Sequence, residues 1–353
     1  MAPRSVRKMT KAKALAALAA GAALVMQGGL CETTAGGNET EAVVPEKKCE
    51  TCEYVAAPLE QYEGISDPAV ELLDFVAALP GGFAVIQENL GNALDFASVL
   101  QVDGAPASYW HDIPTYANAT SMKDGNLTTH SNETGLLVNF VPEIRRGAIG
   151  KLEIIKELEN NPVKYDRKTV TDSAGNALYE RPRYVAYGPN PFTYGAIPQT
   201  WENSEEPDPV TGIVGDNDPI DALDISAGAV PDIGYPYVGK VLGALGLIDD
   251  NETDWKVVMI NAADPKAAEY NDIGDVPEDT KEAIFTYFRD KPVAVGDAPG
   301  VFWPELTDAY GDGVWKNAEE TKEIIQHTSD AYAALVQDCA KVADLEFAYA
   351  GCA

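Results

Sequence analysis

Histidine and cysteine are scarce in this chain, which has three histidines and five cysteines among 353 residues. The histidines, His111, His130 and His327, are spread along the sequence, and the cysteines lie toward its two ends. Nucleophilic serine or cysteine catalysis needs a histidine close to the nucleophile, and this spacing does not support one. The sequence therefore gives no support to a serine or cysteine hydrolase.

Basic residues are also few: 26 lysines and arginines stand against 56 aspartates and glutamates, a formal net charge of −30. Such a surface repels nucleic acid and anionic lipid headgroups, so no nucleic-acid partner is expected. Beyond the N-terminal region no apolar run is long enough to cross a bilayer, and we expect no stable membrane span in the mature chain. A polyanionic substrate is compatible with this charge only if metals or local cations reverse its sign at the site.

Residues 1–30 have the layout of a signal or targeting segment. A basic start is followed by an alanine-rich apolar run from Ala14 to Met26, as in secretory signal peptides. The run is shorter than the roughly 20 residues of a membrane span. We therefore expect a secretory or extracellular protein, with a plastid or another organelle as the alternative.

The cysteines agree with export. Cys31 lies near any plausible cleavage point of the leader, and four cysteines remain beyond it. Cys49 and Cys52 form a CxxC in a polar linker, residues 31–53, and Cys339 and Cys352 lie in a C-terminal tail, residues 339–353. An even set of this kind predicts disulfides in an oxidising compartment, although the sequence does not choose among the three pairings. A zinc site built from the same four cysteines is the alternative.

The rest of the chain divides into a helical extension, residues 54–107, and a main domain, residues 108–338. Apolar residues recur at helical spacing from Val70 to Leu79, and a second amphipathic stretch covers residues 83–100. The main domain reads as short strands that favour a small barrel, closed by a helix over 318–337 with Asn317 as its N-cap. The expected strands are 136–140, 151–155, 183–187, 238–248 and 256–260.

The most specific feature is an acidic cluster in which Asp216, Asp218 and Asp221 fall within six positions, flanked by Gly215 and Pro219. Two like charges at about 4 Å repel by roughly 4 kcal/mol even at an effective dielectric near 20, so the ionised carboxylates need a cation between them. Oxygen ligands alone favour Mg²⁺ or Mn²⁺. An EF-hand is excluded because Asp221 occupies the place of its central glycine.

Two further charged groups flank this cluster in the sequence. A second acidic group lies between Asp249 and Lys256, and Lys151 and Glu153 share one face of an expected strand because side chains alternate there. Alone, the first could be a solvated turn and the second a surface ion pair. Together with the acidic cluster they indicate a site that combines carboxylates with cations.

Four segments resemble signatures of the soluble family I inorganic pyrophosphatases of the longer eukaryotic type. They are Tyr194-Gly-Ala-Ile-Pro-Gln-Thr-Trp-Glu202, Gly215-Asp-Asn-Asp-Pro-Ile-Asp221, Glu252-Thr-Asp-Trp-Lys256 and Asn271-Asp-Ile-Gly-Asp-Val276, with His111-Asp-Ile-Pro114 as a further match. The similarity spans about residues 108–336. It implies a mainly β fold with some α, in which an OB-like five-stranded β-barrel is flanked by helices and preceded here by the N-terminal helical extension.

The resemblance implies hydrolysis of pyrophosphate to two phosphates with about three or four Mg²⁺ ions, Mn²⁺ being an alternative. It assigns Asp216, Asp221 and Asp254 to the first metal, with Asp221 shared by a second. Asp218 would face the water between those metals and accept its proton. The metals that arrive with substrate would be held by Asp249 and Glu153.

The same resemblance places cations and a tyrosine at the phosphates. The residues that match catalytic, phosphate-contacting positions are Lys151, Arg183 and Tyr194, and Lys256 is a further substrate contact. Glu143 matches a supporting acid, and a homodimer is an assembly that the resemblance allows.

The chain departs from the family pattern at two tyrosines. Asn190 stands four places before Tyr194, where the family has tyrosine, and either Tyr187 or Phe192 could substitute. The family's adjacent tyrosine and lysine near the C-terminus are not both present; Lys291 could supply the amine and Tyr287 the displaced ring. The alternative function is therefore a catalytically weakened or non-catalytic homologue that binds metal or phosphate.

Overall fold

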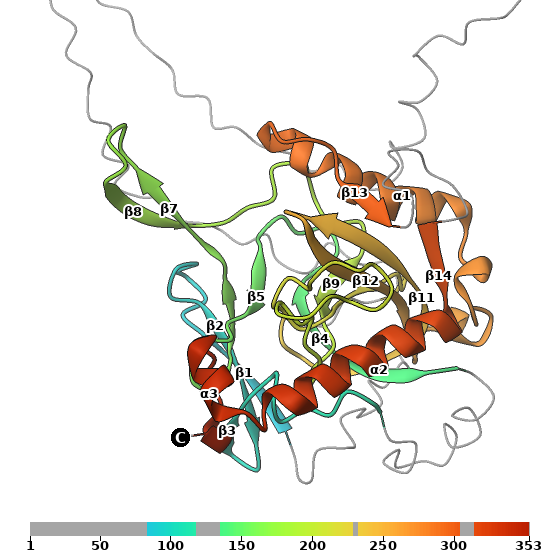
Figure 1. The fold of residues 1–353 in the computed structure, drawn as a ribbon, viewed down its shortest axis with the longest axis horizontal. Coiled ribbons are helices and arrows are strands. Elements are labelled where there is room, and N and C mark those ends of the chain that lie inside the picture. Colours follow the sequence, from blue (N-terminus) through green and yellow to red (C-terminus); the bar gives the residue numbers. More distant parts are fainter. Residues whose placement is uncertain (1–82, 118–134, 229–231, 304–313, 353) are drawn as a thin grey trace, which may run out of the picture. The chain divides into compact units, whose positions relative to one another are not determined.

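The fold is seen in a computed structural model that describes residues 83–117, 135–228, 232–303 and 314–352 (Figure 1). Five strands form a closed ring, in which each strand pairs with the next and the last with the first. All neighbours are antiparallel except the third and fourth. In order around the ring, the strands are β4 (Leu137–Ile144), β9 (Thr193–Ala196), β10 (Asp221–Asp224), β12 (Glu252–Asn261) and β11 (Tyr237–Asp249). This ring confirms the predicted five-stranded barrel.

The longest strand, β11, closes the ring and extends beyond it. Its register against β12 shifts between Val241 and Gly243, and such a bulge bends a strand sharply enough to close a small barrel. Its outer length pairs with two short strands, β13 (Val301–Trp303) and β14 (Trp315–Asn317). Almost every residue of β11 is buried, which explains why its sequence reads as a continuous apolar run rather than an alternating one.

Gly195 shows how closely two barrel strands approach. A Cβ atom added there would lie 2.0 Å from the Val141 carbonyl oxygen on β4 and 2.9 Å from the Phe140 ring. The clash is with backbone, so no side-chain rotation relieves it.

We expect Gly195→Ala to lower the free energy of unfolding by about 3 kcal/mol, measured by chemical denaturation. The control Gly212→Ala replaces a glycine with no atom within 4 Å of an added Cβ and tests only the effect of its positive φ. Equal stability of Gly195→Ala and wild type would contradict the close approach.

Two helices cover the barrel. Helix α2 (Ala318–Leu335) crosses one side of it (Figure 1) and packs Ile324 and Ile325 into the barrel core. Asn317 caps this helix in a reciprocal arrangement with Glu320, as predicted, although the helix ends at Leu335 rather than at residue 337. Helix α1 (Glu278–Asp290) buries its apolar face in a second cluster of hydrophobic core residues. Short 3₁₀ turns occur at η3 (Pro265–Ala268), η4 (Ile273–Asp275) and η5 (Pro292–Val295).

The prediction of helix over residues 83–100 is wrong. These residues form a hairpin of β1 (Phe83–Glu88) and β2 (Ala97–Val102), and β2 also pairs with β3 (Ala105–Ala107). Burial along β1 alternates residue by residue, the period of a strand with one face on the core. Phe96 and Leu100 share a core with Trp110, so the described part of the expected extension belongs to the main domain. The predicted helix over 70–79 lies outside the described residues.

A second sheet runs beside the barrel and continues into a protruding hairpin. Strands β5 (Leu152–Ile154) and β6 (Val163–Tyr165) extend the β1–β2 sheet, and the hairpin of β7 (Arg167–Thr171) and β8 (Ala177–Pro182) projects from it (Figure 1). The strand predicted over 183–187 is wrong: only Tyr184 makes an isolated bridge, to Gly150. The other predicted strands overlap β4, β5, β11 and β12.

The C-terminal residues pack onto the domain. Helix α3 (Cys339–Asp344) and the turn η7 (Ala350–Cys352) are joined by a Cys339–Cys352 disulfide, and Val342 and Phe347 enter the core that contains Trp110. The Cys339–Cys352 bond is one of the disulfides whose pairing the sequence leaves open. It also excludes a zinc site made from all four cysteines, because these two are not thiolates. Cys49 and Cys52 lie outside the described residues. Within the described ranges, no helix has the length and apolar character needed to span a bilayer.

Candidate active site

A cavity of about 290 Å³ opens at one end of the barrel and brings together all the residues that the sequence predicted for the site. They come from strands and loops that are far apart in the chain. Among its lining residues are the predicted metal ligands and proton acceptor, Asp216, Asp218, Asp221, Asp249, Asp254 and Glu153, and the predicted phosphate contacts, Lys151, Arg183, Tyr194, Lys256 and Lys291. Glu143, the predicted supporting acid, lines it as well.

The loop that carries the acidic cluster is held in a fixed conformation. The Asp216 carboxylate accepts a hydrogen bond of 3.0 Å from the Asp218 amide, and Asn217 has a φ of 74°, in the left-handed region that asparagine tolerates. The Asn217 side chain accepts from the Trp201 indole at 2.9 Å. Strand β10 then begins at Asp221, so the loop and the strand end present the three carboxylates to one cavity.

Three carboxylates converge closely enough to hold a metal ion. Glu202, Asp216 and Asp254 each offer an oxygen, and these oxygens lie within 4.8 Å of one another. One Glu202 oxygen accepts from the Trp255 amide at 2.8 Å, whereas the other is buried with no hydrogen-bond partner. A buried carboxylate oxygen without a donor is costly unless a cation satisfies it. The oxygen-only ligand set fits Mg²⁺ or Mn²⁺.

The pKa values of these three acids are raised, first by burial and then by the charges of neighbouring carboxylates. Burial raises the pKa of Glu202 well above its usual range, and the charges of Asp216 and Asp254 raise it further. Burial likewise raises the pKa of Asp216, with Asp254 as the next cause. The pKa of Asp254 rises to about 7 because burial outweighs the opposing charge of Lys256. In the protein without metal, these groups therefore keep their protons to a higher pH than ordinary carboxyls do.

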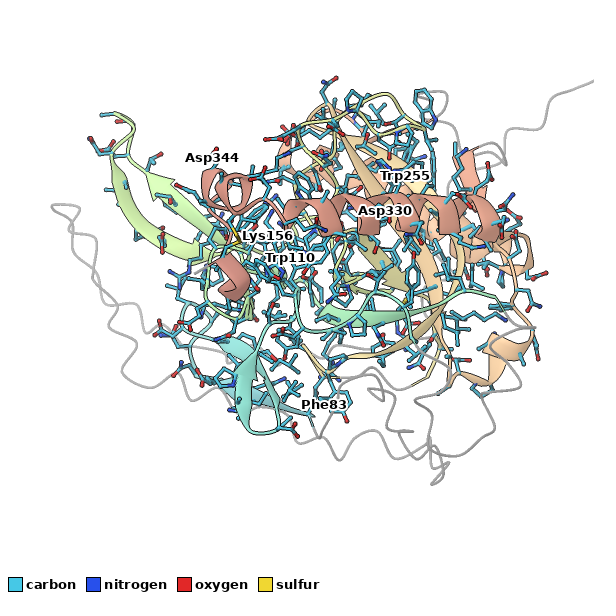
Figure 2. The ribbon with its side chains drawn as sticks, turned by 60° about the horizontal axis from the view of Figure 1, so that its bottom comes forward. Phe83, Trp110, Lys156, Trp255, Asp330 and Asp344 are labelled. Atoms are coloured by element: carbon cyan, nitrogen blue, oxygen red, sulfur yellow. A yellow bond between two sulfur atoms is a disulfide. The ribbon has the colours of Figure 1, made fainter. Side chains whose placement is uncertain are left out.

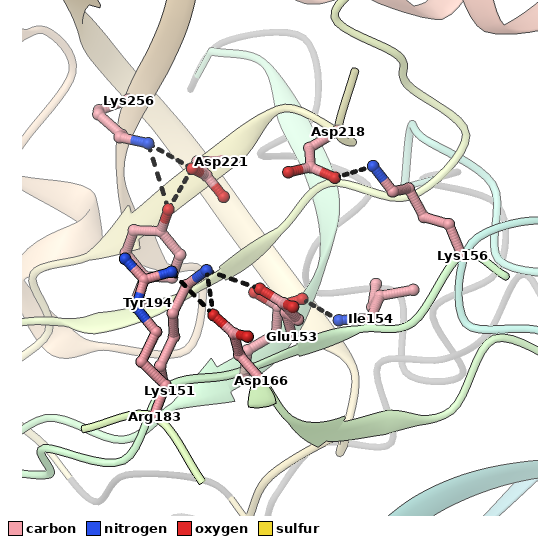
Figure 3. A network of polar contacts seen from close by, with 11 residues as sticks. Lys151, Glu153, Ile154, Lys156, Asp166, Arg183, Tyr194, Asp218, Asp221 and Lys256 are labelled. Carbon is pink, nitrogen blue, oxygen red and sulfur yellow. Dashed lines mark hydrogen bonds and ion pairs between the residues drawn. The ribbon is translucent and has the colours of Figure 1, made fainter. Parts of the chain in front are cut away.

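Lys256 is the cation inside this acidic group. Its ammonium forms ion pairs with Asp221 and Asp254, and it donates to the Tyr194 hydroxyl at 3.2 Å (Figure 3). Tyr194 in turn donates to Asp221. Burial alone would lower the pKa of Lys256, but the charges of Asp221 and Asp254 hold it above its usual value. Lys256 is only 3% exposed, so it stays a fixed positive charge between the acidic group and the remainder of the cavity.

A second cluster carries the cations of the opposite wall. Lys151 pairs with Glu153 at 2.8 Å and with Asp166 at 3.0 Å, and Arg183 reaches the same Asp166 oxygen at 2.9 Å (Figure 3). Asp166 thus bridges two cations that would otherwise repel each other. Although burial opposes it, these two cations hold the pKa of Asp166 below its usual value. The expected Lys151–Glu153 pair is present, and it lies in the cavity rather than on the open surface.

Glu143 supports this wall from within the barrel. It is 4% exposed, and its carboxylate accepts from the Ile154 amide at 2.7 Å, which joins β4 to β5 beside Glu153. Burial raises the pKa of Glu143 well above its usual range, and the charge of Asp221 raises it further. A carboxyl in this position links β4 to β5, the strand that carries Glu153.

Comparison with known proteins decides what kind of site this is. The sequence model described as inorganic pyrophosphatase matches residues 140–333. An inorganic pyrophosphatase of Kluyveromyces lactis is 36% identical over 248 residues, which cover 69% of this chain and 77% of the relative. The chain belongs to the inorganic pyrophosphatase family. A relative of the same name from Schizosaccharomyces pombe is 34% identical over 248 residues, covering 69% of this chain and 76% of its own length.

Solved pyrophosphatase structures share the fold. A Trypanosoma cruzi vacuolar soluble pyrophosphatase, truncated at its N-terminal domain and in complex with PPi, matches with a TM-score of 0.62 at 27% identity, covering 74% of this chain and 94% of its own. The inorganic pyrophosphatase from Schistosoma japonicum matches with a TM-score of 0.57 at 32% identity, covering 71% and 80%. The fold class expected from the pyrophosphatase resemblance is therefore confirmed.

The departures from the pyrophosphatase pattern meet in one place. Tyr287 donates a hydrogen bond to the Asn190 side chain, and both residues line a larger adjoining cavity of about 570 Å³ together with Lys291. Lys291 also lines the site cavity, as predicted for the amine. Phe192 is buried and stacks on Phe288 at 5.6 Å, so it does not replace the missing tyrosine.

Sequence reasoning missed Glu202, Asp166 and Lys156. Glu202 is the last residue of the quoted motif that begins at Tyr194, but it gives no signal of its own, because its role depends on burial beside Asp216 and Asp254. Asp166 follows β6 and acts only through its contacts with Lys151 and Arg183. Lys156 pairs with Asp218, 62 positions away in the sequence. These pairings arise from tertiary structure.

Proposed function

We propose that this chain hydrolyses inorganic pyrophosphate to two orthophosphates with Mg²⁺, or alternatively Mn²⁺, as cofactor. The observation that carries the proposal is the division of one cavity into an acidic wall, with Asp216 and Asp254, and a cationic wall, with Lys151 and Arg183. Pyrophosphate carries up to about four negative charges, which a carboxylate wall binds only through metal ions. Family membership makes the chain an inorganic diphosphatase.

The acidic wall prepares the nucleophile. Asp216, Asp221 and Asp254 would hold the first metal, with Glu202 offering a further oxygen beside it. A bound divalent cation lowers the pKa of its water toward about 7, so that a nucleophile is available near neutral pH. Asp218 is placed to accept the proton from the attacking water, as a positioned carboxylate can. We assign Asp249 and Glu153 to the metals that enter with the substrate.

The cationic wall receives the phosphates. Lys151 and Arg183 are held side by side by Asp166, so their charges converge before substrate binds. Positive charge fixed in this way stabilises the leaving phosphate without reorganisation during the reaction. Lys256, which donates a hydrogen bond to the Tyr194 hydroxyl, would contact the substrate together with Tyr194 from the acidic side. Lys291 is the further amine of the cavity.

The second candidate is a weakened homologue, and the Tyr287–Asn190 pair is the observation that favours it, since it engages a hydroxyl that could otherwise meet phosphate. Metal titration separates the two. We expect phosphate release from pyrophosphate to rise with millimolar Mg²⁺ and to stop when a chelator is added. Saturable Mg²⁺ binding without turnover, in a protein that unfolds cooperatively, would favour the weakened homologue.

We also propose a secretory or extracellular location, or a plastid or other organelle, and a homodimeric assembly. The basic and apolar residues 1–30 support the targeting, and the Cys339–Cys352 disulfide fits an oxidising compartment. Fusion of residues 1–30 to a fluorescent reporter tests the location; a reporter that stays in the cytosol would contradict it. Light scattering of the purified chain tests the dimer, and a monomer mass would exclude it.

A further inference from the structure

We propose that the disulfide-closed C-terminal segment, residues 339–352, holds Lys156 against Asp218, so that Lys156 is a positioning residue and reduction of the disulfide slows turnover. The inference rests on the proposed function, in which Asp218 accepts a proton. It goes beyond that function because it concerns contacts made by the C-terminal segment, which lies after the residues matched by the family, 140–333.

Lys156 fixes the loop that carries Asp218. Its ammonium donates to the Asn217 carbonyl at 2.6 Å and forms an ion pair with the Asp218 carboxylate (Figure 3). The Asp218 side chain is 51% exposed, whereas that of Lys156 is 12% exposed. An exposed carboxylate samples several rotamers unless a partner restrains it. Since Lys156 does not line the 290 Å³ cavity, it restrains Asp218 from outside the substrate's space.

Lys156 is itself held by the C-terminal segment. The Ala348 amide donates to the Lys156 carbonyl at 2.8 Å, and the Phe347 ring lies with its centroid 5.3 Å from the Lys156 ammonium. The Asn161 side chain joins the two segments, donating to the carbonyls of Lys156 at 2.9 Å and Ala348 at 3.3 Å. Figure 2 shows Lys156 beside Trp110, below the helix that ends at Asp344. The lysine is therefore fixed at its backbone and along its side chain.

The disulfide closes the part of the chain that makes these contacts. Cys339 begins α3 and Cys352 ends η7, so Phe347 and Ala348 lie inside a loop closed at both ends. Phe347 packs edge-on against Trp110 at 5.1 Å, and the His111 ring contacts the Ala348 carbonyl at 3.2 Å. A closed loop has fewer alternative conformations than an open one, which favours the bound arrangement of the segment.

A second contact leads from the same segment to the same loop. Lys341 on α3 pairs with Glu205 at 2.6 Å and lies 5.9 Å from the Trp201 ring. Trp201 donates its indole hydrogen to the Asn217 side chain at 2.9 Å. The segment thus reaches Asn217 through Trp201 and Asp218 through Lys156. Both contacts weaken together if the segment loosens.

The disulfide is accessible to a small dithiol because Cys339 is exposed and Cys352 is half-buried. A thiolate of the dithiol attacks one sulfur and displaces the other as a protein thiolate, and the second thiol of the reagent then closes its own disulfide. Two electrons pass to the protein, and two protons complete Cys339 and Cys352 as thiols. Reduction opens the loop without changing any residue of the cavity.

The first test replaces Lys156 in the full chain, with turnover of pyrophosphate as the readout. We expect Lys156→Met to lower kcat about tenfold, with KM and the Mg²⁺ dependence unchanged, and Lys156→Arg to restore most of the activity. The control is Lys164→Met, which removes a lysine that donates to the Phe96 carbonyl at 2.9 Å, away from Asp218. Thermal unfolding verifies that each variant folds. Unchanged kcat in Lys156→Met would overturn the inference.

The second test combines reduction with substitution. We expect dithiothreitol to lower the kcat of the wild type about threefold to tenfold, but to leave Lys156→Met and the Cys339→Ser/Cys352→Ser variant as they are. The double cysteine variant also controls for reduction of the other three cysteines. Equal slowing of all three proteins by the reductant, or no slowing of the wild type, would overturn the coupling. An oxidised wild type that releases no phosphate would instead contradict the proposed function.

Discussion

Replacing Asp218 by asparagine should lower kcat for pyrophosphate hydrolysis by about 10² to 10⁴-fold, the usual contribution of a positioned general base. The amide keeps the shape of the side chain but cannot accept a proton from water. The Asp218 side chain is 51% exposed, and Asp218 is not one of the three residues whose carboxylate oxygens lie within 4.8 Å of one another. We therefore expect Mg²⁺ affinity to change by no more than a few-fold.

The measurement pairs steady-state phosphate release with Mg²⁺ binding by calorimetry. Asp330→Asn serves as the control because Asp330 is exposed on α2, where it accepts a hydrogen bond from Gln326. The control should keep wild-type kcat and Mg²⁺ affinity. A kcat for Asp218→Asn within a few-fold of wild type would remove Asp218 from the role of proton acceptor and leave it as a neighbour of the metals.

Replacing Asp254 by asparagine should have opposite effects on activity and on stability. Asp254 is 7% exposed, and its burial outweighs the opposing charge of Lys256, so its own charge is unfavourable until a metal binds. The substitution removes that charge and should stabilise the metal-free protein at pH 8 by about 4 kcal/mol, the equivalent of raising a carboxyl pKa from about 4 to about 7. It also removes a ligand, and we expect turnover to fall at least about 10²-fold.

The pH dependence follows from the raised pKa of Asp254. In the folded protein the pKa of this carboxyl is about 7, above the ordinary value of 3.8 that it has in the unfolded chain. Between these values the folded state binds the extra proton, so the wild type loses stability as pH rises through this range. The asparagine variant lacks this proton, and its advantage should therefore be small near pH 4, grow toward pH 7 and then level off.

Urea unfolding of the metal-free proteins at pH 5 and pH 8 measures this difference. Added Mg²⁺ should stabilise the wild type, by about 2.7 kcal/mol at 100 times the Kd, and should stabilise Asp254→Asn much less. The matched control, Asp330→Asn, should show a small difference from wild type that is the same at both pH values. A metal-free Asp254→Asn variant less stable than wild type at pH 8 would contradict the crowding of charge in the acidic group.

The part of the predicted site that lies on the barrel was recovered because its residues stand at fixed positions along paired strands. Asp221 begins β10, Lys256 lies opposite it on the parallel strand β12, and Tyr194 lies on the neighbouring β9. Short local motifs therefore set which side chains meet once the strands pair. The sequence could not reveal Glu202 as a ligand, because nothing in its local pattern states that one of its oxygens is buried without a partner.

The hairpin of residues 83–102 shows where periodicity misleads. Over six residues, the half-buried β1 places Phe83, Val85 and Gln87 inward, too short a run to separate a period of two from one of 3.6. Its pairing with β2 and the core around Trp110 decide the outcome. The sequence likewise predicts only a tail at the C-terminus. It does not reveal that this segment packs on the domain, because the packing depends on contacts between Phe347 and a core formed by distant residues.

The most direct test of the central claim is the stoichiometry of phosphate release by the oxidised full chain with pyrophosphate and Mg²⁺. We expect two orthophosphates for each pyrophosphate consumed, turnover that stops when a chelator removes the metal, and recovery when Mg²⁺ is restored. A folded chain that binds Mg²⁺ but releases no phosphate from pyrophosphate would contradict the account.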